Sequence, residues 1–500
     1  MKRVLALVLC LCFVLGGCAQ NTQHTEEGGG VTPAPSQTEQ PAAASFEQLA
    51  LRLATLPELP QEPDESAFWD QLNALDYEKL GDEQYNEEYQ KLWDAFSAQQ
   101  DAYYEAVQSL RGDGVDNALT LPLTAYTFRT VRQLLEGAAE NNVVYSPANL
   151  YLALCMLAET TDGESRAQVL NLLGLSSVEQ ARGAANALWR NLYRDSATGR
   201  TLPANSLWLN EQFTYHEDTV DTLANEHYAS TFRAPMGEKA TDAAIAQWIN
   251  ENTNHLLENA ANGLETNSDT LMLLISTLYF KGTWADQFED FNTREDTFTA
   301  ADGAEQTIDF MHQTKNGNYY RGEGFTVASL PFMGGTSMWF LLPDEGVKLS
   351  EIVTPTWNLP MMAVDTSEGC YELPAYDLIA QQNYGEIHWS VPKFDVDSDL
   401  DLIPQLQALG VTDIFDDTRA DFSPLTDLDA VVSAVKHAAR VKVDEEGCEA
   451  AAFTAMMAEA TAAMPEELPI VEMDLNRPFG FLITGTEGLP LFTGVVNTME

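Results

Sequence analysis

The chain has 500 residues and carries 76 acidic against 26 basic side chains, which gives a formal net charge of −50. So acidic a chain cannot present a strongly basic face, which excludes binding to the phosphate backbone of nucleic acids. Hydrophobic residues make up 45% of the chain, which excludes global disorder.

Residues 1–17 have the pattern of a secretion signal. The positive pair Lys2-Arg3 precedes an apolar run from Val4 to Val14, which is too short to span a bilayer. The run leads into Leu15-Gly16-Gly17-Cys18, which resembles the lipobox of bacterial lipoproteins. This resemblance implies that Cys18 is acylated, becomes the first residue of the mature chain and holds the protein on a membrane surface. The alternative is an ordinary cleaved signal followed by an incidental cysteine.

The next two segments differ in composition. Residues 18–64 are acidic and rich in Pro, Gly, Gln and Thr, which is typical of a flexible tether. Residues 65–115 carry aromatic and apolar side chains at near-helical spacing among acids, which predicts a helical spacer of one or two amphipathic helices. Residues 116–500 form continuous globular material, in which we find no Pro/Gly/Ser linker.

Within the globular part, helical patterns come first and strand-like runs follow. Helices are predicted at Leu121–Ala138, Pro147–Leu157, Glu164–Leu173 and Val178–Arg194. Strands are predicted at Thr270–Phe280, Thr326–Pro331, Ser337–Leu342, Glu386–Asp395, Ala439–Val443, Phe479–Thr484 and Leu491–Val496. This order, with long connections, predicts the α+β class.

Enzyme signatures are missing from the sequence. It contains no HExxH, no GxSxG, no phosphate-binding GxxxxGK[ST] and no GxGxxG after a strand. The seven histidines are scattered. We therefore expect no catalytic residues, no metal and no cofactor.

The segment from Glu445 to Pro465 is unusual because almost all its side chains are small or unbranched. Read with a period of two, one face would carry Cys448, Ala450, Ala452 and Thr454, small side chains that would let a strand enter a narrow gap in a sheet. The same residues are compatible with an exposed loop or an alanine-rich helix.

Residues 120–500 resemble the serpins, the serine-protease inhibitor family, through seven motifs in family order. The motifs begin with Asn142 to Leu150, Thr161 to Ser165 and Ala204 to Trp208, and the fourth is Leu278 to Trp284 with Phe288, Thr293 and Phe298. The last three are Val391 to Phe394, the hinge-like Glu445 to Ala452, and Asn476 to Phe479 with Pro490 to Asn497.

The resemblance implies a serpin fold of about nine helices around three β-sheets, with an exposed reactive-centre loop. It also implies a monomeric inhibitor, not an enzyme, whose loop is cleaved as bait and then inserts into the central sheet while the target serine protease stays bound as an ester. By resemblance, the hinge comprises Glu445, Gly447, Cys448, Glu449, Ala450, Ala451, Ala452 and Thr454, the shutter is Ser146 with His437, and the breach contains Trp284.

The bond to be cleaved is placed by counting about sixteen residues from the hinge glutamate, as the family pattern implies. The count gives Thr461–Ala462, with Ala460, Ala463 and Met464 as alternatives. No Arg or Lys occurs between Lys442 and Arg477, so trypsin-like targets are disfavoured and elastase-like or subtilisin-like proteases are expected.

Some positions depart from the family pattern. Cys448 stands where Thr or Ser is usual, Phe453 replaces a small residue, and Ser276 stands where the family generally has Asn. Ser146 and His437 could in principle form a hydrolase pair, but we interpret them as a buried polar bridge. We interpret Arg182, Arg190 and Arg194 as a solvated face and not as a polyanion site.

Two further hypotheses about the function remain open. A non-inhibitory serpin could act as a cell-surface binding protein, although such members tend to carry bulky or charged hinge residues. A solute-binding lipoprotein is suggested only by the lipobox and tether. We expect a location at the bacterial cell surface or outside the cell, through the lipid anchor at Cys18.

Overall fold

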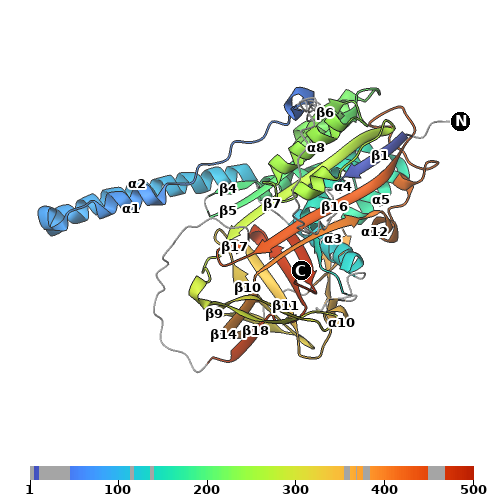
Figure 1. Cartoon of the computed structure of the whole chain (residues 1–500). Coiled ribbons are helices and arrows are strands. Elements are labelled where there is room, and N and C mark those ends of the chain that lie inside the picture. The colour runs from blue at the N-terminus through green and yellow to red at the C-terminus, as the bar shows by residue number, and fades with distance from the viewer. Residues whose placement is uncertain are drawn as a thin grey trace, which may run out of the picture.

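The computed structural model describes residues 5–10, 45–112, 117–135, 140–196, 198–353, 361–366, 369–374, 383–448 and 468–499. These residues form two nine-stranded sheets, here called sheet A and sheet B, and one two-stranded sheet. Helices cover sheet A, and sheet B lies at the lower end of the molecule in Figure 1.

Sheet A runs through the middle of the molecule. Its spatial order is β15, β16, β17, β7, β5, β6 and β2, with β4 beside β5. Its strands are β1 (Leu5–Cys10), β2 (Ala50–Arg52), β4 (Arg194–Ser196), β5 (Gly199–Asn210), β6 (Ala229–Ala234), β7 (Thr270–Thr283), β15 (Phe394–Asp401), β16 (Ala430–Val443) and β17 (Gly447–Cys448). Because β7 is covered on both faces, its sequence is a nearly continuous apolar run.

In sheet B, the long strand β9 connects the other strands, because it pairs with β8, β14 and β10. Its strands are β3 (Val143–Tyr145), β8 (Thr293–Thr299), β9 (Glu305–Arg321), β10 (Phe325–Pro331), β11 (Ser337–Pro343), β14 (Asn383–Pro392), β18 (Ile470–Asp474), β19 (Phe479–Thr484) and β20 (Pro490–Val496). The two-stranded sheet consists of β12 (Met361–Thr366) and β13 (Gly369–Pro374).

The described residues contain nine α-helices in the globular part and two in the extension before it. They are α1 (Glu65–Asn73), α2 (Tyr77–Arg111), α3 (Asn117–Leu135), α4 (Pro147–Thr160), α5 (Gly163–Leu173), α6 (Val178–Leu192), α7 (Glu217–Glu226), α8 (Lys239–Asn252), α9 (Glu258–Asn262), α10 (Leu349–Val353) and α12 (Ile403–Ala408). Short 3₁₀ helices are η1 (Phe46–Leu49), η2 (Asp290–Asn292), η3 (Asp413–Phe415) and η4 (Thr486–Gly488). No described helix is both long and apolar enough to cross a membrane.

Helix α4 lies in the core. It begins at the N-cap Ser146, whose side chain accepts a hydrogen bond from the backbone of Asn149, and Pro147 occupies its first turn. Every residue of α4 is buried, which fits a helix that is apolar on all sides. It packs against β7 of sheet A and β20 of sheet B, so it fixes the two sheets relative to each other.

The extension before the globular part is partly docked, which corrects part of the expected tether. Phe46 packs edge-on against Phe232 at 5.8 Å, and β2 pairs with β6 at the edge of sheet A. Residues 46–52 therefore lie against the globular part, because Phe46 and Leu49 pack on its core there. The expected spacer helices are present as α1 and α2, which project from the body as a rod (Figure 1).

Strand β1 belongs to the segment that we expect to be removed as a signal. It pairs in parallel with both β16 and β7, from Leu5 opposite Ala430 to Cys10 opposite Lys436 on the β16 side. The space between β7 and β16 can therefore hold an additional strand.

Candidate functional site

The hinge-like segment begins inside sheet A. Strand β17 lies between β16 and β7 and is antiparallel to both: Cys448 pairs with Val443 on one side and with Gly282 on the other. Cys448 is buried, and it is not part of a disulfide. Gly447 and Cys448 thus occupy the head of a gap between two long strands.

Trp284 holds the turn that leads into β17. Its indole Nε1 donates a 3.0 Å hydrogen bond to the carbonyl of Asp444, and its backbone N–H donates a 3.0 Å hydrogen bond to that of Glu446. The buried indole also stacks on Phe332 with ring centroids 4.3 Å apart. Trp284 therefore lies where the chain enters the sheet.

Glu445 has three polar partners. Its carboxylate lies 2.8 Å from Nζ of Lys393 and accepts a 2.9 Å hydrogen bond from Oγ1 of Thr293, while its carbonyl accepts a hydrogen bond from the backbone of Phe288. Burial alone would raise the pKa of Glu445, but the hydrogen bonds from Lys393 and Thr293 outweigh it and the pKa is lowered. The glutamate is therefore an anchor for the start of the segment.

Gly447 is required by a close approach. A Cβ atom at this position would overlap the carbonyl oxygen of Gly282 on β7. Only glycine lets β17 approach β7 so closely.

A narrow cavity of about 30 Å³ continues below Cys448 between β7 and β16. Its walls include Ser276 and Tyr279 of β7, Ala438 of β16 and, on the core side, Ser146. Leu256 and Leu257, between α8 and α9, also line it. The gap thus extends from the hinge toward Ser146, and the connection between α8 and α9 borders it.

Ser146 and His437 meet in the core, as their expected pairing requires. The backbone N–H of Ser146 donates a 3.0 Å hydrogen bond to Nε2 of His437, whereas Ser146 Oγ donates a 2.7 Å hydrogen bond to the carbonyl of Leu491. Because the serine hydroxyl bonds a carbonyl and not the imidazole, this geometry does not activate a nucleophile. Burial lowers the pKa of His437 to about 3, so the ring is neutral at ordinary pH.

Two buried polar atoms at the middle of β7 and β16 have no hydrogen-bond partner in the structure. They are Nδ1 of His437 and Oγ of Ser276, and both residues are fully buried. Ser276 is shorter than the asparagine generally found in the family at this position, so its hydroxyl forms no bridge here.

The remaining site residues fall outside the described residues. They are Cys18, Glu449, Ala450, Ala451, Ala452, Thr454, Ala460, Thr461, Ala462, Ala463 and Met464.

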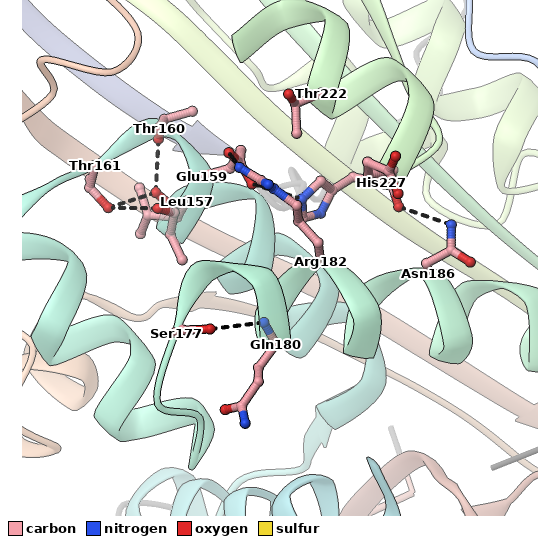
Figure 2. Close-up of polar contacts among 12 residues, drawn as sticks. Leu157, Glu159, Thr160, Thr161, Ser177, Gln180, Arg182, Asn186, Thr222 and His227 are labelled. Atoms are coloured by element: carbon pink, nitrogen blue, oxygen red, sulfur yellow. Dashed lines mark hydrogen bonds and ion pairs between the residues drawn. The ribbon is translucent and has the colours of Figure 1, made fainter. Parts of the chain in front are cut away.

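The three arginines of α6 and β4 do not form the solvated face that we expected. Arg182 makes two 2.6 Å hydrogen bonds to Glu159, and Figure 2 shows His227 beside this pair. Arg190 donates to the carbonyls of Leu110 and Ser109 at the end of α2. Arg194 donates to the carbonyl of Gly334 and to two hydroxyls.

This correction has a physical reason. The helix periodicity that places the arginines near one another does not show that the end of α2 and Glu159 of α4 lie within their reach. Each guanidinium is engaged by the protein itself.

The comparisons with known proteins agree with this geometry. The family model described as serpin (serine protease inhibitor) matches residues 122–499. The chain belongs to the serpin family.

Similar serpins occur in distant organisms. Serpin-ZX of Arabidopsis thaliana is 27% identical over 399 residues, which is 76% of this chain and 97% of the relative. Neuroserpin of Mus musculus is 27% identical over 410 residues, which is 80% of this chain and 97% of the relative. The solved structure of the thermophilic serpin tengpin in its native state has a TM-score of 0.66 at 26% identity and covers 77% of this chain and 96% of tengpin.

These findings confirm the expected α+β serpin fold and place the chain in a family of protease inhibitors. Sequence reasoning missed the residues that hold the start of the hinge-like segment, namely Lys393, Thr293 and Phe332. Lys393 and Thr293 stand inside motifs that carried the family resemblance, so a lone cation and a hydroxyl within those motifs were the available signal.

Proposed function

We propose that this serpin is inhibitory and traps an elastase-like or subtilisin-like serine protease by cleavage and insertion of its reactive-centre loop. The observation that carries the proposal is the position of β17, already seated between β7 and β16 at the head of the gap. Non-inhibitory action as a cell-surface binding protein is the alternative.

The register of β17 supports the bond Thr461–Ala462. Cys448 pairs with Gly282 and Val443, and each further residue of an antiparallel strand moves one residue back along both neighbours. If the strand continued in this register, residue 460 would lie opposite Thr270 and residue 461 would lie opposite Ala430. These are the first residues of β7 and β16. An inserted strand that fills the gap therefore ends at Thr461.

The same register gives Thr454 a specific place. It would lie between Ser276 and His437, whose Oγ and Nδ1 have no hydrogen-bond partners while buried. A threonine hydroxyl both donates and accepts, so it can bond both atoms. Insertion would thereby satisfy two polar groups whose burial without partners costs about 1–3 kcal/mol each.

The size of the side chains favours inhibition over the binding-protein alternative. The cavity beneath Cys448 is narrow, and Ala450 and Ala452 would follow Cys448 onto the same face of the new strand. Bulky or charged residues there would block insertion, and this chain has none at those positions.

The chemistry follows the expected serpin reaction. The serine of the protease attacks the carbonyl carbon of Thr461, the bond to the nitrogen of Ala462 breaks, and Ala462 leaves as a protonated amine. Thr461 remains esterified to the protease. The thirteen residues from Glu449 to Thr461 would then carry the protease about 43 Å along the sheet at ~3.3 Å per residue.

We also propose that the protein is a bacterial lipoprotein anchored by acyl chains on Cys18. Cleavage before Cys18 would remove β1 from sheet A and free that part of the gap. The protease would then be trapped at the cell surface.

The test is incubation of the full chain with pancreatic elastase, neutrophil elastase and subtilisin, followed by denaturing electrophoresis. We expect a complex that survives denaturation with at least one of them. Ala450→Arg should convert the protein into a substrate that is cleaved without complex, whereas the matched control Ala450→Ser should retain the complex. Cleavage without complex by every protease would favour the binding-protein alternative.

A further inference from the structure

Three strands at one end of sheet B share a solvent-facing surface. Strand β14 pairs with β9 on one side and with the edge strand β18 on the other. Side chains alternate along each strand, and one face is buried in the core by Ile387, Trp389 and Met473. The opposite face carries Tyr384, Glu386, His388, Ile470 and Glu472, here called the β14–β18 face.

Two large apolar side chains are exposed on this face. Tyr384 is 53% exposed and Ile470 is 61% exposed. Ile470 pairs with Glu386, which is two residues beyond Tyr384, so their α-carbons are about 8 Å apart by strand spacing. A single exposed apolar residue needs no explanation, but two on one face can meet the same partner surface.

The charged groups of the β14–β18 face contact one another. Nε2 of His388 lies 2.9 Å from a carboxylate oxygen of Glu386, and Nδ1 lies 3.0 Å from one of Glu472. The neighbouring residues of β9 on this face are the uncharged Thr314, Asn316 and Asn318. At neutral pH the two carboxylates make the face anionic, and no Lys or Arg stands among these described positions.

The position of the face relative to the bait bond is limited by the chain. Ile470 follows Ala462 by eight residues, which span at most roughly 29 Å even when fully extended. A protease domain of roughly 200 residues has a radius of gyration of about 16 Å, so it is about 40 Å across. A protease that attacks the bond Thr461–Ala462 must therefore come close to this face.

We propose that the β14–β18 face is a second docking surface for the target protease. Tyr384 and Ile470 contact an apolar patch of the protease, and Glu386 and Glu472 accept hydrogen bonds from its Lys or Arg side chains. The partner is thus a protease whose surface beside the catalytic cleft is basic and partly apolar. This inference rests on the proposed inhibitory function and adds a determinant of which protease is bound.

The test measures the second-order rate constant of complex formation and the stoichiometry of inhibition for the full chain, with whichever of the three proteases forms the complex. Ile470→Ser and Tyr384→Ser should each lower the rate constant about five- to tenfold, as expected for a contact residue at an interface. The double variant Glu386→Gln, Glu472→Gln should lower the rate constant and flatten its dependence on salt. Leu53→Ser is the matched control, because Leu53 is 62% exposed and follows β2, which pairs with β6 in sheet A and not with any strand of sheet B.

The stoichiometry of inhibition should stay unchanged in all four variants, because the face acts on encounter and not on loop insertion. Rate constants equal to that of Leu53→Ser would overturn the docking surface and leave the inhibitory function standing. A changed stoichiometry would also overturn it, since the substitutions would then act on the loop. Absence of any complex with the unaltered chain would remove the proposed function and the docking surface together.

Discussion

The backbone N–H of Ser146 donates a 3.0 Å hydrogen bond to Nε2 of His437, and both residues are buried beneath the gap between β7 and β16. The bond needs a lone pair on Nε2, so it exists only while the imidazole is neutral. It joins the start of α4 to the strand that must separate from β7 when another strand enters.

The first prediction concerns acid. The pKa of His437 is lowered to about 3 by burial, from an ordinary value near 6.5. A group whose pKa is lower in the folded state makes no pH-dependent contribution above pH 6.5 and destabilises the fold increasingly as the pH falls from 6.5 toward 3. The free energy of unfolding should therefore fall between pH 7.5 and pH 5, as measured by urea unfolding.

His437→Gln is the comparison variant, because its amide oxygen can still accept from Ser146 but does not titrate. The variant should lose less stability than the unaltered chain over the same pH interval. Equal losses would show that other groups cause the acid sensitivity.

The second prediction concerns Gly447. A Cβ atom there would overlap the carbonyl of Gly282, so Gly447→Ala should displace β17 from the head of the gap. We expect a lower rate of loop insertion and therefore a higher stoichiometry of inhibition, by about two- to fivefold for a cost of about 0.4–1 kcal/mol at the insertion step. Gly183→Ala is the control, since nothing lies within 4 Å of a Cβ at that helical position. An unaltered stoichiometry in Gly447→Ala would contradict the seating of β17.

The third prediction concerns the buried pair of Glu159 and Arg182, shown in Figure 2. Burial alone would raise the pKa of Glu159, but the hydrogen bonds from Arg182, together with His227 at 3.6 Å, outweigh it and lower the pKa to about 2. Arg182→Met should cost about 2 kcal/mol at pH 7, less than the roughly 3–5 kcal/mol of a fully buried pair, because the arginine side chain is 34% exposed. The double variant Glu159→Gln, Arg182→Met should recover part of this loss in urea unfolding.

The pH dependence of this pair has a defined sign. The folded-state pKa lies below the ordinary 4.5, so the pair contributes its stability above pH 4.5 and loses it as the pH falls toward 2. The difference in the free energy of unfolding between Arg182→Met and the unaltered chain should therefore become smaller below pH 4.5. A difference that stays constant down to pH 3 would refute the assignment.

The fourth prediction concerns Thr454, which would lie between Ser276 and His437 in the proposed inserted strand. Thr454→Val keeps the shape but removes the hydroxyl, so the loop-cleaved form should lose about 1–3 kcal/mol while the intact form changes little. Thr454→Ser should behave like the unaltered chain. The midpoints of guanidinium unfolding, measured for the intact and for the loop-cleaved form of each variant, report the stability of the two forms. A loss shared equally by the two forms would place the hydroxyl elsewhere.

Sequence motifs predicted most of the fold because each motif lies on a buried element. Ser146 and His437, which the family resemblance pairs, are hydrogen-bonded in the structure, and Trp284 bonds the turn that leads into β17. Strand-like runs were recognised where apolar residues are continuous, as in β7, but β16 was predicted only from Ala439 because its first half mixes polar with apolar residues.

The parts that were missed depend on contacts between segments far apart in the chain. Residues 45–52 lie inside the segment that we expected to be a tether, and their packing on Phe232 and pairing with β6 show that they dock. We predicted Arg190 to be solvated because its partner, Leu110 at the end of α2, is 80 residues away in the sequence. Composition and periodicity carry no information about such distances.

The central claim is that the cleaved loop becomes a strand between β7 and β16. Amide hydrogen exchange of the full chain, before and after cleavage at Thr461–Ala462, tests it most directly. The account predicts that peptides covering residues 449–461, and the middle of β7 and β16 around Ser276 and His437, become strongly protected after cleavage. Free exchange of residues 449–461 in the cleaved protein would contradict it.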